Sequence, residues 1–191
     1  MKEVLLLLTD HWADWEAGFA IAGISQQYHV KTIAIDKLPK ASIGGMRAEI
    51  DCKIAEYQSF GNLAMVILVG SFSWGEGRHD EIAGFVRDAH ATGVPIAAIC
   101  GATIFLARHG FLDNIKHTGD DAEYFAEMLQ GETGYNGQEN FTGGQVVSDG
   151  GIITATETAA IEFAREIFRM LQTDSNEEID AWYRRMRGCQ E

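Results

Sequence analysis

The amino-acid sequence predicts an α/β fold: a three-layer α/β/α sandwich in a single domain, built on a mostly parallel, doubly wound sheet. Apolar runs of strand length alternate with helix-length segments along the chain. The first run, residues 4–8, is apolar at every position, which is typical of a strand buried on both faces of a sheet. The 191 residues, 46% of them hydrophobic, suit one core better than two.

The predicted strands are short apolar runs bounded by turn residues. Residues 145–147 and 152–155 are joined by Asp149-Gly150-Gly151, which indicates a hairpin at a small antiparallel edge of the sheet. Residues 41–53 mix single apolar residues with a Gly-Gly pair and indicate a hairpin or an irregular excursion. The other predicted strands cover residues 4–9, 30–35, 65–69 and 96–99.

The predicted helices follow from apolar residues at helical spacing. They cover residues 14–27, 80–91, 101–109, 120–129, 159–171 and 179–186. Residues 1–172 form the predicted domain, and residues 173–191 form a helical tail that carries Trp182 and Tyr183.

Charge and cysteine content exclude several classes of function. The chain has 15 basic and 28 acidic residues, a net charge of −13, so we expect neither nucleic acid nor an anionic membrane as a partner. Three cysteines without a C-x-x-C pair indicate a reducing compartment. The sequence shows no nucleotide-binding glycine motif and no metal-ligand spacing, so we expect no cofactor and no metal. Its apolar runs are too short for a signal peptide or a membrane span, and we expect a cytoplasmic protein.

Cys100 stands between the predicted strand 96–99 and Gly101, where a helix is predicted to begin. This order predicts a nucleophile elbow, in which small neighbours permit a sharp turn between strand and helix. The N-terminal end of a helix lowers the pKa of a thiol, so we expect a depressed pKa for Cys100. The alternative is an inert cysteine buried at the end of a strand.

Two other strand ends carry residues that suit the same site, because ligands bind at the carboxyl ends of the strands in open α/β sheets. Gly70 and Ser71 follow one strand, and their N–H groups are candidates for an oxyanion hole or belong to a simple turn. Glu16 follows the first strand and either partners the thiol or interacts with the helix dipole.

Four segments, in the expected order, resemble the PfpI superfamily. They are ADWEAGFA (13–20), MVILVGS (65–71), AAICGATIFLARHGFL (97–112) and VVSDGGIITATETAAIEFA (146–164). The resemblance covers roughly residues 1–172. The superfamily includes intracellular proteases, the Parkinson-associated deglycase and bacterial type 1 glutamine amidotransferase-like proteins, and it implies a class I glutamine amidotransferase-like fold.

The resemblance implies that Cys100 is the reactive thiol and Glu16 is its carboxyl partner. It also implies that Gly70, Ser71 and Gly101 supply backbone donors to an oxyanion. Relatives commonly form dimers, so we expect a homodimer, with Trp182 and Tyr183 of the tail at the interface.

The family's histidine is the ambiguous element. Thr118 stands where some relatives have this residue, and His117 precedes it. We take His117 as the candidate base, oriented by Asp120 or Asp121, and His11 as the second candidate.

Three positions depart from the family pattern and count against protease activity. Gly101 follows the nucleophile where the protease branch has His, Ser71 replaces a Gly, and Glu157 stands where a Gly is usual.

A small apolar pocket is expected near these residues. Its candidate residues are Asp10, His11, Trp12, Trp74 and Thr118. Phe72 also lies near the expected mouth, whereas Trp15 suits a core position better. The acidic residues between 120 and 127 suit a solvated helix face.

The favoured function is therefore a cysteine-dependent enzyme, either a hydrolase or a lyase. Its small-molecule substrate is a carbonyl or amide compound, as in glyoxalase or deglycase chemistry. Glutamine amidotransferase activity is disfavoured, because no His follows His117. The alternatives are a stress-response sensor whose Cys100 is oxidised, and a catalytically silent binding protein.

Overall fold

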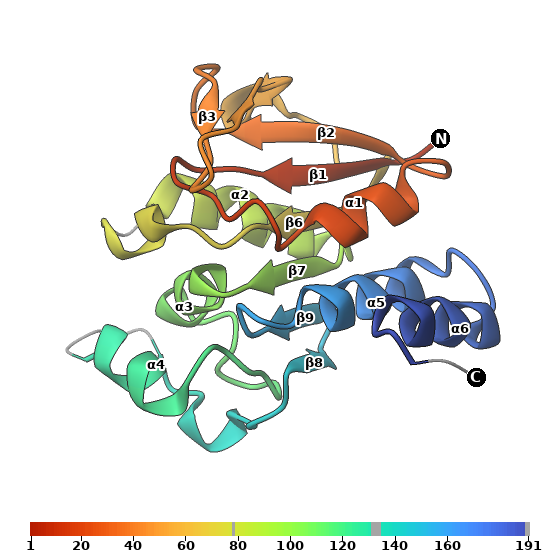
Figure 1. Cartoon of the computed structure of the whole chain (residues 1–191). Helices are drawn as coiled ribbons and strands as arrows, with labels where there is room; N and C mark the ends of the chain where they lie inside the picture. Colours follow the sequence, from red (N-terminus) through yellow and green to blue (C-terminus); the bar gives the residue numbers. More distant parts are fainter. Residues whose placement is uncertain (78, 131–134, 190–191) are drawn as a thin grey trace.

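The computed structural model describes residues 1–77, 79–130 and 135–189. Within these ranges, seven strands form one sheet in the order β5-β2-β1-β6-β7-β9-β8 (Figure 1). All neighbouring strands are parallel except β8 and β9, which form an antiparallel hairpin. The predicted α/β fold with a mostly parallel sheet is confirmed.

The elements have the following bounds. The strands are β1 (Glu3–Leu7), β2 (His29–Ala34), β3 (Lys40–Ala41), β4 (Arg47–Ala48), β5 (Cys52–Lys53), β6 (Leu63–Leu68), β7 (Ile96–Ile99), β8 (Val146–Asp149) and β9 (Ile152–Ala155). The helices are α1 (Gly18–Ile24), α2 (Asp80–Ala91), α3 (Gly101–Arg108), α4 (Ala122–Met128), α5 (Ala160–Leu171) and α6 (Asn176–Met186). Short 3-10 turns cover Ile54–Glu56, Phe72–Gly75 and Gln138–Asn140.

The core lies on both faces of the sheet, because side chains alternate along each strand. In β1, Leu5 and Leu7 pack with α2 and α3, whereas Val4 and Leu6 pack with α1, α5 and α6. The helices therefore cover both faces, which gives the predicted three layers.

Two predicted helices begin three or more residues away from their N-terminal ends in the structure. The helix predicted over 14–27 covers only Gly18–Ile24, because the N–H of Ala13 donates to the carbonyl oxygen of Gly70 at 2.9 Å and residues 14–17 form a turn. The last helix begins earlier than predicted, at Asn176. Ser175 caps it and forms a capping box with Glu178.

Residues 41–53 contain the predicted hairpin, formed by β3 and β4. They also contain β5, which extends the sheet beside β2 and which the pattern did not indicate.

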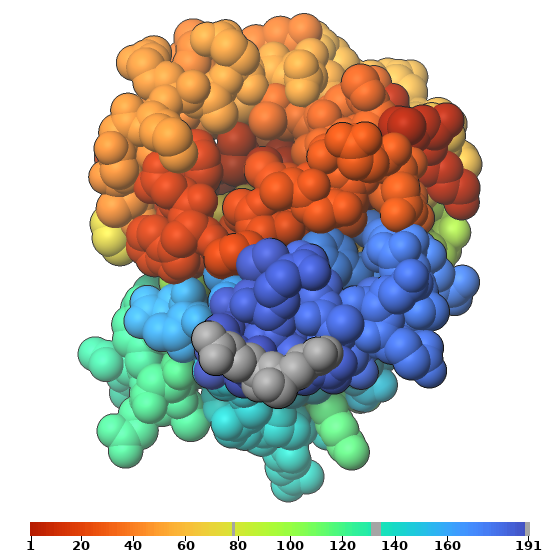
Figure 2. Space-filling model, turned by 45° about the vertical axis from the view of Figure 1, so that its right-hand side comes forward, coloured from red at the N-terminus to blue at the C-terminus, as the bar shows by residue number. Residues whose placement is uncertain are grey.

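The aromatic residues of the tail pack within their own chain. Trp182 meets Phe168 of α5 edge to face, with ring centroids 4.7 Å apart, and also contacts Phe19 of α1. The hydroxyl of Tyr183 donates to Glu162 at 2.9 Å. Figure 2 shows the surface of this C-terminal segment adjoining that of the N-terminal segment. Both side chains thus make contacts within one chain, and their place at a dimer interface stays a prediction.

None of the helices in the described ranges is long and apolar enough to cross a membrane.

We expect Trp182→Ala to lower the free energy of unfolding by about 2 kcal/mol, because two edge-to-face contacts and the buried ring area are lost. Urea titration followed by circular dichroism measures this change. Met186→Ala on the same helix is the control, because Met186 is exposed. Equal midpoints for the two variants would contradict the packing of α6 described above.

Candidate functional site

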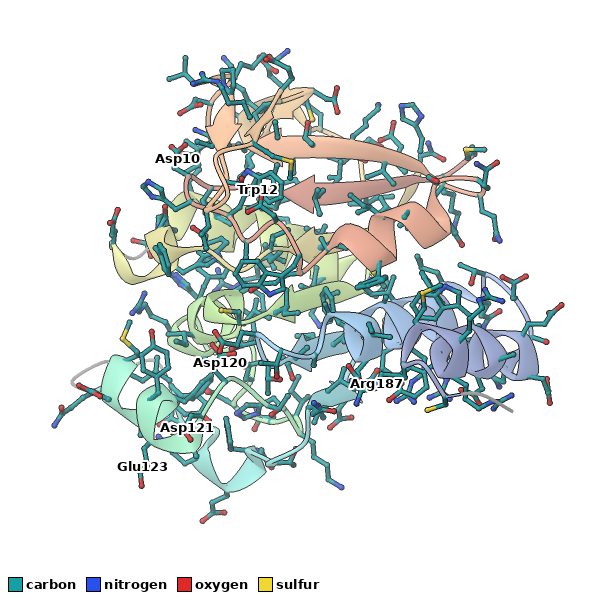
Figure 3. The ribbon with its side chains drawn as sticks, viewed as in Figure 1. Asp10, Trp12, Asp120, Asp121, Glu123 and Arg187 are labelled. Carbon is teal, nitrogen blue, oxygen red and sulfur yellow. The ribbon has the colours of Figure 1, made fainter. Side chains whose placement is uncertain are left out.

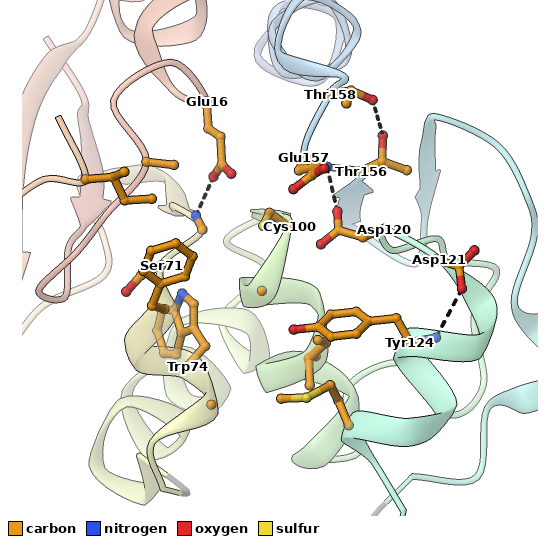
Figure 4. A pocket seen from close by; sticks show the side chains of 18 of the residues that line it. Glu16, Ser71, Trp74, Cys100, Asp120, Asp121, Tyr124, Thr156, Glu157 and Thr158 are labelled. Carbon is orange, nitrogen blue, oxygen red and sulfur yellow. Dashed lines mark hydrogen bonds between the residues drawn. The ribbon is translucent and has the colours of Figure 1, made fainter.

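A pocket of about 710 Å³ opens at the carboxyl ends of the parallel strands. Its walls come from the β1–α1 turn, the Phe72–Gly75 turn, the start of α3, helix α4 and the β9–α5 loop (Figure 4). Cys100 lies among the residues that line it.

Cys100 occupies the sharp turn between β7 and α3. Its φ of 57° lies in the left-handed region, which costs a non-glycine residue about 1–3 kcal/mol. The surrounding structure fixes this conformation. The N–H of Cys100 donates to Ala155 of β9 at 3.0 Å, and its carbonyl oxygen accepts from the N–H of Thr103 at 2.9 Å. The predicted nucleophile elbow is present.

Glu16 has no exposed surface and lies beside the thiol. Its Oε2 accepts a hydrogen bond of 2.6 Å from the N–H of Gly70, while Oε1 has no hydrogen-bond partner in the described part of the chain. Burial raises the pKa of Glu16 to about 8, so its carboxyl group carries a proton at neutral pH.

Gly70 is required by this close approach. A Cβ at this position would overlap the Glu16 carboxyl group and lie 2.7 Å from Cys100 Cβ. The N–H of Gly70 is already used by Glu16. Ser71 and Gly101 also line the pocket, and their N–H groups are the backbone donors left for an oxyanion.

Asp120 is the second carboxyl group beside the thiol. Its Oδ1 accepts a hydrogen bond of 2.6 Å from the N–H of Glu157. The sulfur of Cys100 and one carboxylate oxygen each of Asp120 and Glu157 lie within 4.8 Å of one another. We expected Asp120 on a solvated face or as a partner of His117. It instead precedes α4, whose N-cap is Asp121, and faces Cys100 (Figure 4).

The prediction of a depressed pKa for Cys100 is wrong. Burial is the largest influence and raises the pKa of the thiol, and the negative charges of Glu16, once that group ionises at high pH, and of Asp120 raise it further. The N–H of Gly101, at the start of α3, lowers it but is outweighed. Thiolate therefore forms here only when a base takes the proton.

His117 lies outside the pocket and cannot be the base in this geometry. The side chain is fully buried among the rings of Tyr135, Phe125 and Phe141. Its Nδ1 lies 2.8 Å from the carbonyl oxygen of Ile115, so Nδ1 carries the hydrogen and donates it. Its Nε2 accepts from the hydroxyl of Tyr135 at 2.7 Å, and burial lowers the pKa of the ring.

Thr118 lies outside the pocket lining and connects neighbouring segments by hydrogen bonds. It is buried, its N–H donates to Thr154 Oγ1 at 2.9 Å, and its hydroxyl donates to the carbonyl oxygen of Gly144 at 2.6 Å. It does not line the pocket. These bonds tie the segment before Asp120 to β9.

Asp10, His11 and Trp12 also lie outside the pocket lining (Figure 3 labels Asp10 and Trp12). The carbonyl oxygen of Asp10 accepts from the hydroxyl of Ser71 at 2.6 Å, and the indole of Trp12 donates to Lys40 at 3.2 Å. His11 is exposed. These residues brace the wall, and His11 is not placed to act as the base.

Four aromatic side chains do line the pocket, namely Trp15, Phe72, Trp74 and Tyr124. Trp74 was predicted there and is fully buried. Trp15 was expected in the core, but it is 49% exposed and its indole donates to the carbonyl oxygen of Glu157 at 3.2 Å. Tyr124 was not singled out by the sequence, because α4 reads as an ordinary acidic surface helix.

The thiol and the two carboxylates around it have the donor chemistry to hold a divalent cation. Sequence spacing gave no sign of this, because Cys100, Asp120 and Glu157 come from three separate loops.

We expect Glu16→Gln to remove a pH dependence of stability. Between pH 4.5 and about 8, folded wild type keeps a proton that the unfolded chain releases, so its stability falls as pH rises through this window. The variant should gain on wild type by at most about 1.4 kcal/mol per pH unit there. Urea unfolding from below pH 4.5 to above pH 8 measures the difference. Exposed Glu123→Gln is the control, and a Glu16→Gln profile parallel to wild type would refute the assignment.

Comparisons with known proteins agree with this geometry. The model of the DJ-1/PfpI family matches residues 2–170. Two proteins of Bacillus subtilis (strain 168) are similar. "Uncharacterized protease YoaZ" is 32% identical, with 96% of this chain and 90% of its own length covered. "Uncharacterized protease YdeA" is 34% identical, with 94% and 88% covered.

Solved structures of the same superfamily are also similar. A thiJ/pfpI family protein from Bacillus anthracis has a TM-score of 0.88 and 30% identity, over 96% of this chain and 89% of its own. A DJ-1 superfamily protein from Agrobacterium tumefaciens has a TM-score of 0.84 and 24% identity, over 95% and 97%. With the elbow, the buried glutamate and these matches together, the chain belongs to the DJ-1/PfpI family.

Proposed function

We propose that the chain is a cysteine-dependent enzyme in which Cys100 attacks the carbonyl carbon of a small aldehyde, ketone or amide. The observation that carries this proposal is the position of the thiol. It lies at an elbow in a pocket, between a protonated carboxyl group on Glu16 and the carboxyl group of Asp120.

The two carboxyl groups suit the two proton transfers of the attack, because one can accept a proton and the other can donate one. Asp120 takes the proton of the thiol as the sulfur–carbon bond forms, and Glu16 gives its proton to the carbonyl oxygen. The net reaction adds the sulfur and a proton across the C=O bond. The proton that Asp120 took from the thiol then passes to Glu16 and restores its protonated form. The N–H groups of Ser71 and Gly101 are the proposed oxyanion donors.

An amide substrate needs one further pair of steps. Before Asp120 passes on its proton, the carbonyl re-forms and returns its proton to Glu16, the carbon–nitrogen bond breaks, and the leaving nitrogen takes the proton that Asp120 holds. Water then attacks the thioester, the carbon–sulfur bond breaks, and the carboxylic acid leaves as the thiol of Cys100 regains its proton. The names of the two Bacillus relatives support hydrolysis. The pocket volume of about 710 Å³ supports a small molecule rather than a folded protein as substrate.

A second candidate function is an oxidation sensor in a stress response. Two equivalents of peroxide would each transfer one oxygen atom to the Cys100 sulfur and be reduced to water, giving first a sulfenic acid and then a sulfinate. The unpartnered, protonated oxygen of Glu16 favours this candidate, because it can donate a hydrogen bond to a sulfinate oxygen. Mass spectrometry of the Cys100 peptide after peroxide treatment, in wild type and Glu16→Gln, tests whether the carboxyl group stabilises that form.

Asp120→Asn should separate thiol reactivity from catalysis. Removing the negative charge of Asp120 lowers the pKa of Cys100, so alkylation by iodoacetamide at neutral pH should be faster than in wild type. Turnover should fall by about 100-fold, because the base is lost. Peptide mass spectrometry follows alkylation, and consumption of 2-oxoaldehydes or amine release from small amides follows turnover.

Two variants complete this test. Glu123→Gln, an exposed acid on α4, should leave both rates unchanged. Cys100→Ser should abolish turnover, and turnover that survives this substitution would overturn the proposed function.

A further inference from the structure

The described pocket lining contains acidic side chains and no basic one, and because Glu16 keeps its proton at neutral pH the negative charge comes from the other acids. Among its described lining residues, four carry carboxyl groups, and none is Lys, Arg or His. These four are Glu16, Asp120, Asp121 and Glu157. A small pocket with walls of low polarity concentrates the electrostatic field of the carboxylates that line it. The pocket therefore repels anions and attracts cations.

One of these carboxyl groups, that of Glu16, has an oxygen without a hydrogen-bond partner among the described residues. Glu16 is completely buried, it lines the pocket, and its Oε1 has no hydrogen-bond partner within the described residues. A buried polar atom without a partner is destabilising, and because this carboxyl group is protonated, an acceptor such as the carbonyl oxygen of a ligand would remove that cost.

The aromatic lining suits the same kind of ligand. Trp15 and Tyr124 are 49% and 45% exposed, so their rings are accessible from the pocket mouth. Aromatic rings attract ammonium and guanidinium groups through their negatively polarised faces. Figure 4 shows Tyr124 below Cys100 and Asp120, on the side of the pocket opposite Glu157.

We propose that the pocket selects organic cations, so that the substrate carries an ammonium, amidinium or guanidinium group close to the carbonyl that Cys100 attacks. The cation lies between the carboxylates of Asp120 and Glu157 and the rings of Trp15 and Tyr124. This assignment of substrate class rests on the proposed function for the reacting carbonyl. The preference for cations can be measured as binding, without any reaction at Cys100.

The pocket dimensions favour an organic cation over a bare metal ion as this occupant. A volume of about 710 Å³ with aromatic walls is far larger than one ion requires. The N–H of Glu157 donates to Asp120 Oδ1 and holds this carboxylate, and the Trp15 indole donates to the carbonyl oxygen of Glu157 and holds the same loop. The charged side of the pocket is therefore preorganised for a ligand.

Three probes of nearly identical shape test the charge preference: benzamidinium, benzamide and benzoate, with charges of +1, 0 and −1. Their dissociation constants are measured by titration calorimetry on Cys100→Ser protein, so that no reaction occurs, with EDTA present to exclude metal ions. We expect benzamidinium to bind at least about tenfold more tightly than benzamide, and benzoate to bind more weakly than either.

The source of the preference is tested by single substitutions in the same background. Glu157→Gln changes an exposed side chain and should fold normally. Both it and Asp120→Asn should weaken benzamidinium binding by about threefold to tenfold and leave benzamide unchanged. Glu123→Gln is the matched control. Glu123 lies on α4 outside the pocket lining, so its substitution should not alter binding (Figure 3).

Equal affinities for the three probes would overturn the inference. The same follows if Glu123→Gln weakens binding as much as Glu157→Gln, because the preference would then come from the overall charge of the chain. The proposed function fails separately. If benzamidinium binds selectively but wild type converts neither cationic aldehydes nor cationic amides, the cation site stands and the enzyme assignment falls.

Discussion

The burial of one carboxyl group, that of Glu16, sets the arrangement of the site. The group is placed among the ends of three parallel strands and receives one hydrogen bond, from the N–H of Gly70. Because a side chain at position 70 would collide with it and with Cys100, the turn after β6 has to contain glycine. Removal from water raises the pKa of Glu16 to about 8, which makes it a proton donor at neutral pH. The left-handed turn at Cys100 then brings the thiol to this donor.

The reactivity of the thiol is controlled by its surroundings. Elbow cysteines gain thiolate character from a helix N-terminus, but here burial and carboxylates outweigh that contribution. Cys100 therefore stays a thiol at neutral pH, and in the proposed mechanism Asp120 takes its proton during the attack. A cationic substrate between the carboxylates would offset their charge, which links the selectivity proposed for the pocket to the ionisation of Cys100.

The sequence predicted the residues whose positions follow from strand topology. Cys100, Glu16 and Gly70 come together because the carboxyl ends of parallel strands share one sheet edge. The wrong assignments depend on long-range contacts. His117 was favoured as base, but Tyr135, which takes its Nε2, lies on a separate loop. Asp120 was read as a surface residue, because its position is set by the bond between Thr118 and Thr154. Trp15 was assigned to the core rather than to the pocket because the helix expected around it begins only at Gly18.

The order of synthesis gives a further meaning to the hydrogen bond between Cys100 and Ala155. Residues 1–108 contain β1, β6 and β7 together with the thiol and Glu16, so they emerge from the ribosome before β9 exists. Until β9 pairs with β7, the elbow lacks this bond, and neither Asp120 nor Glu157 has its anchor. A nascent chain thus carries Cys100 and Glu16 before the residues proposed as base and as cation-binding wall are in place. The proposed site is therefore completed only after most of the polypeptide has been made.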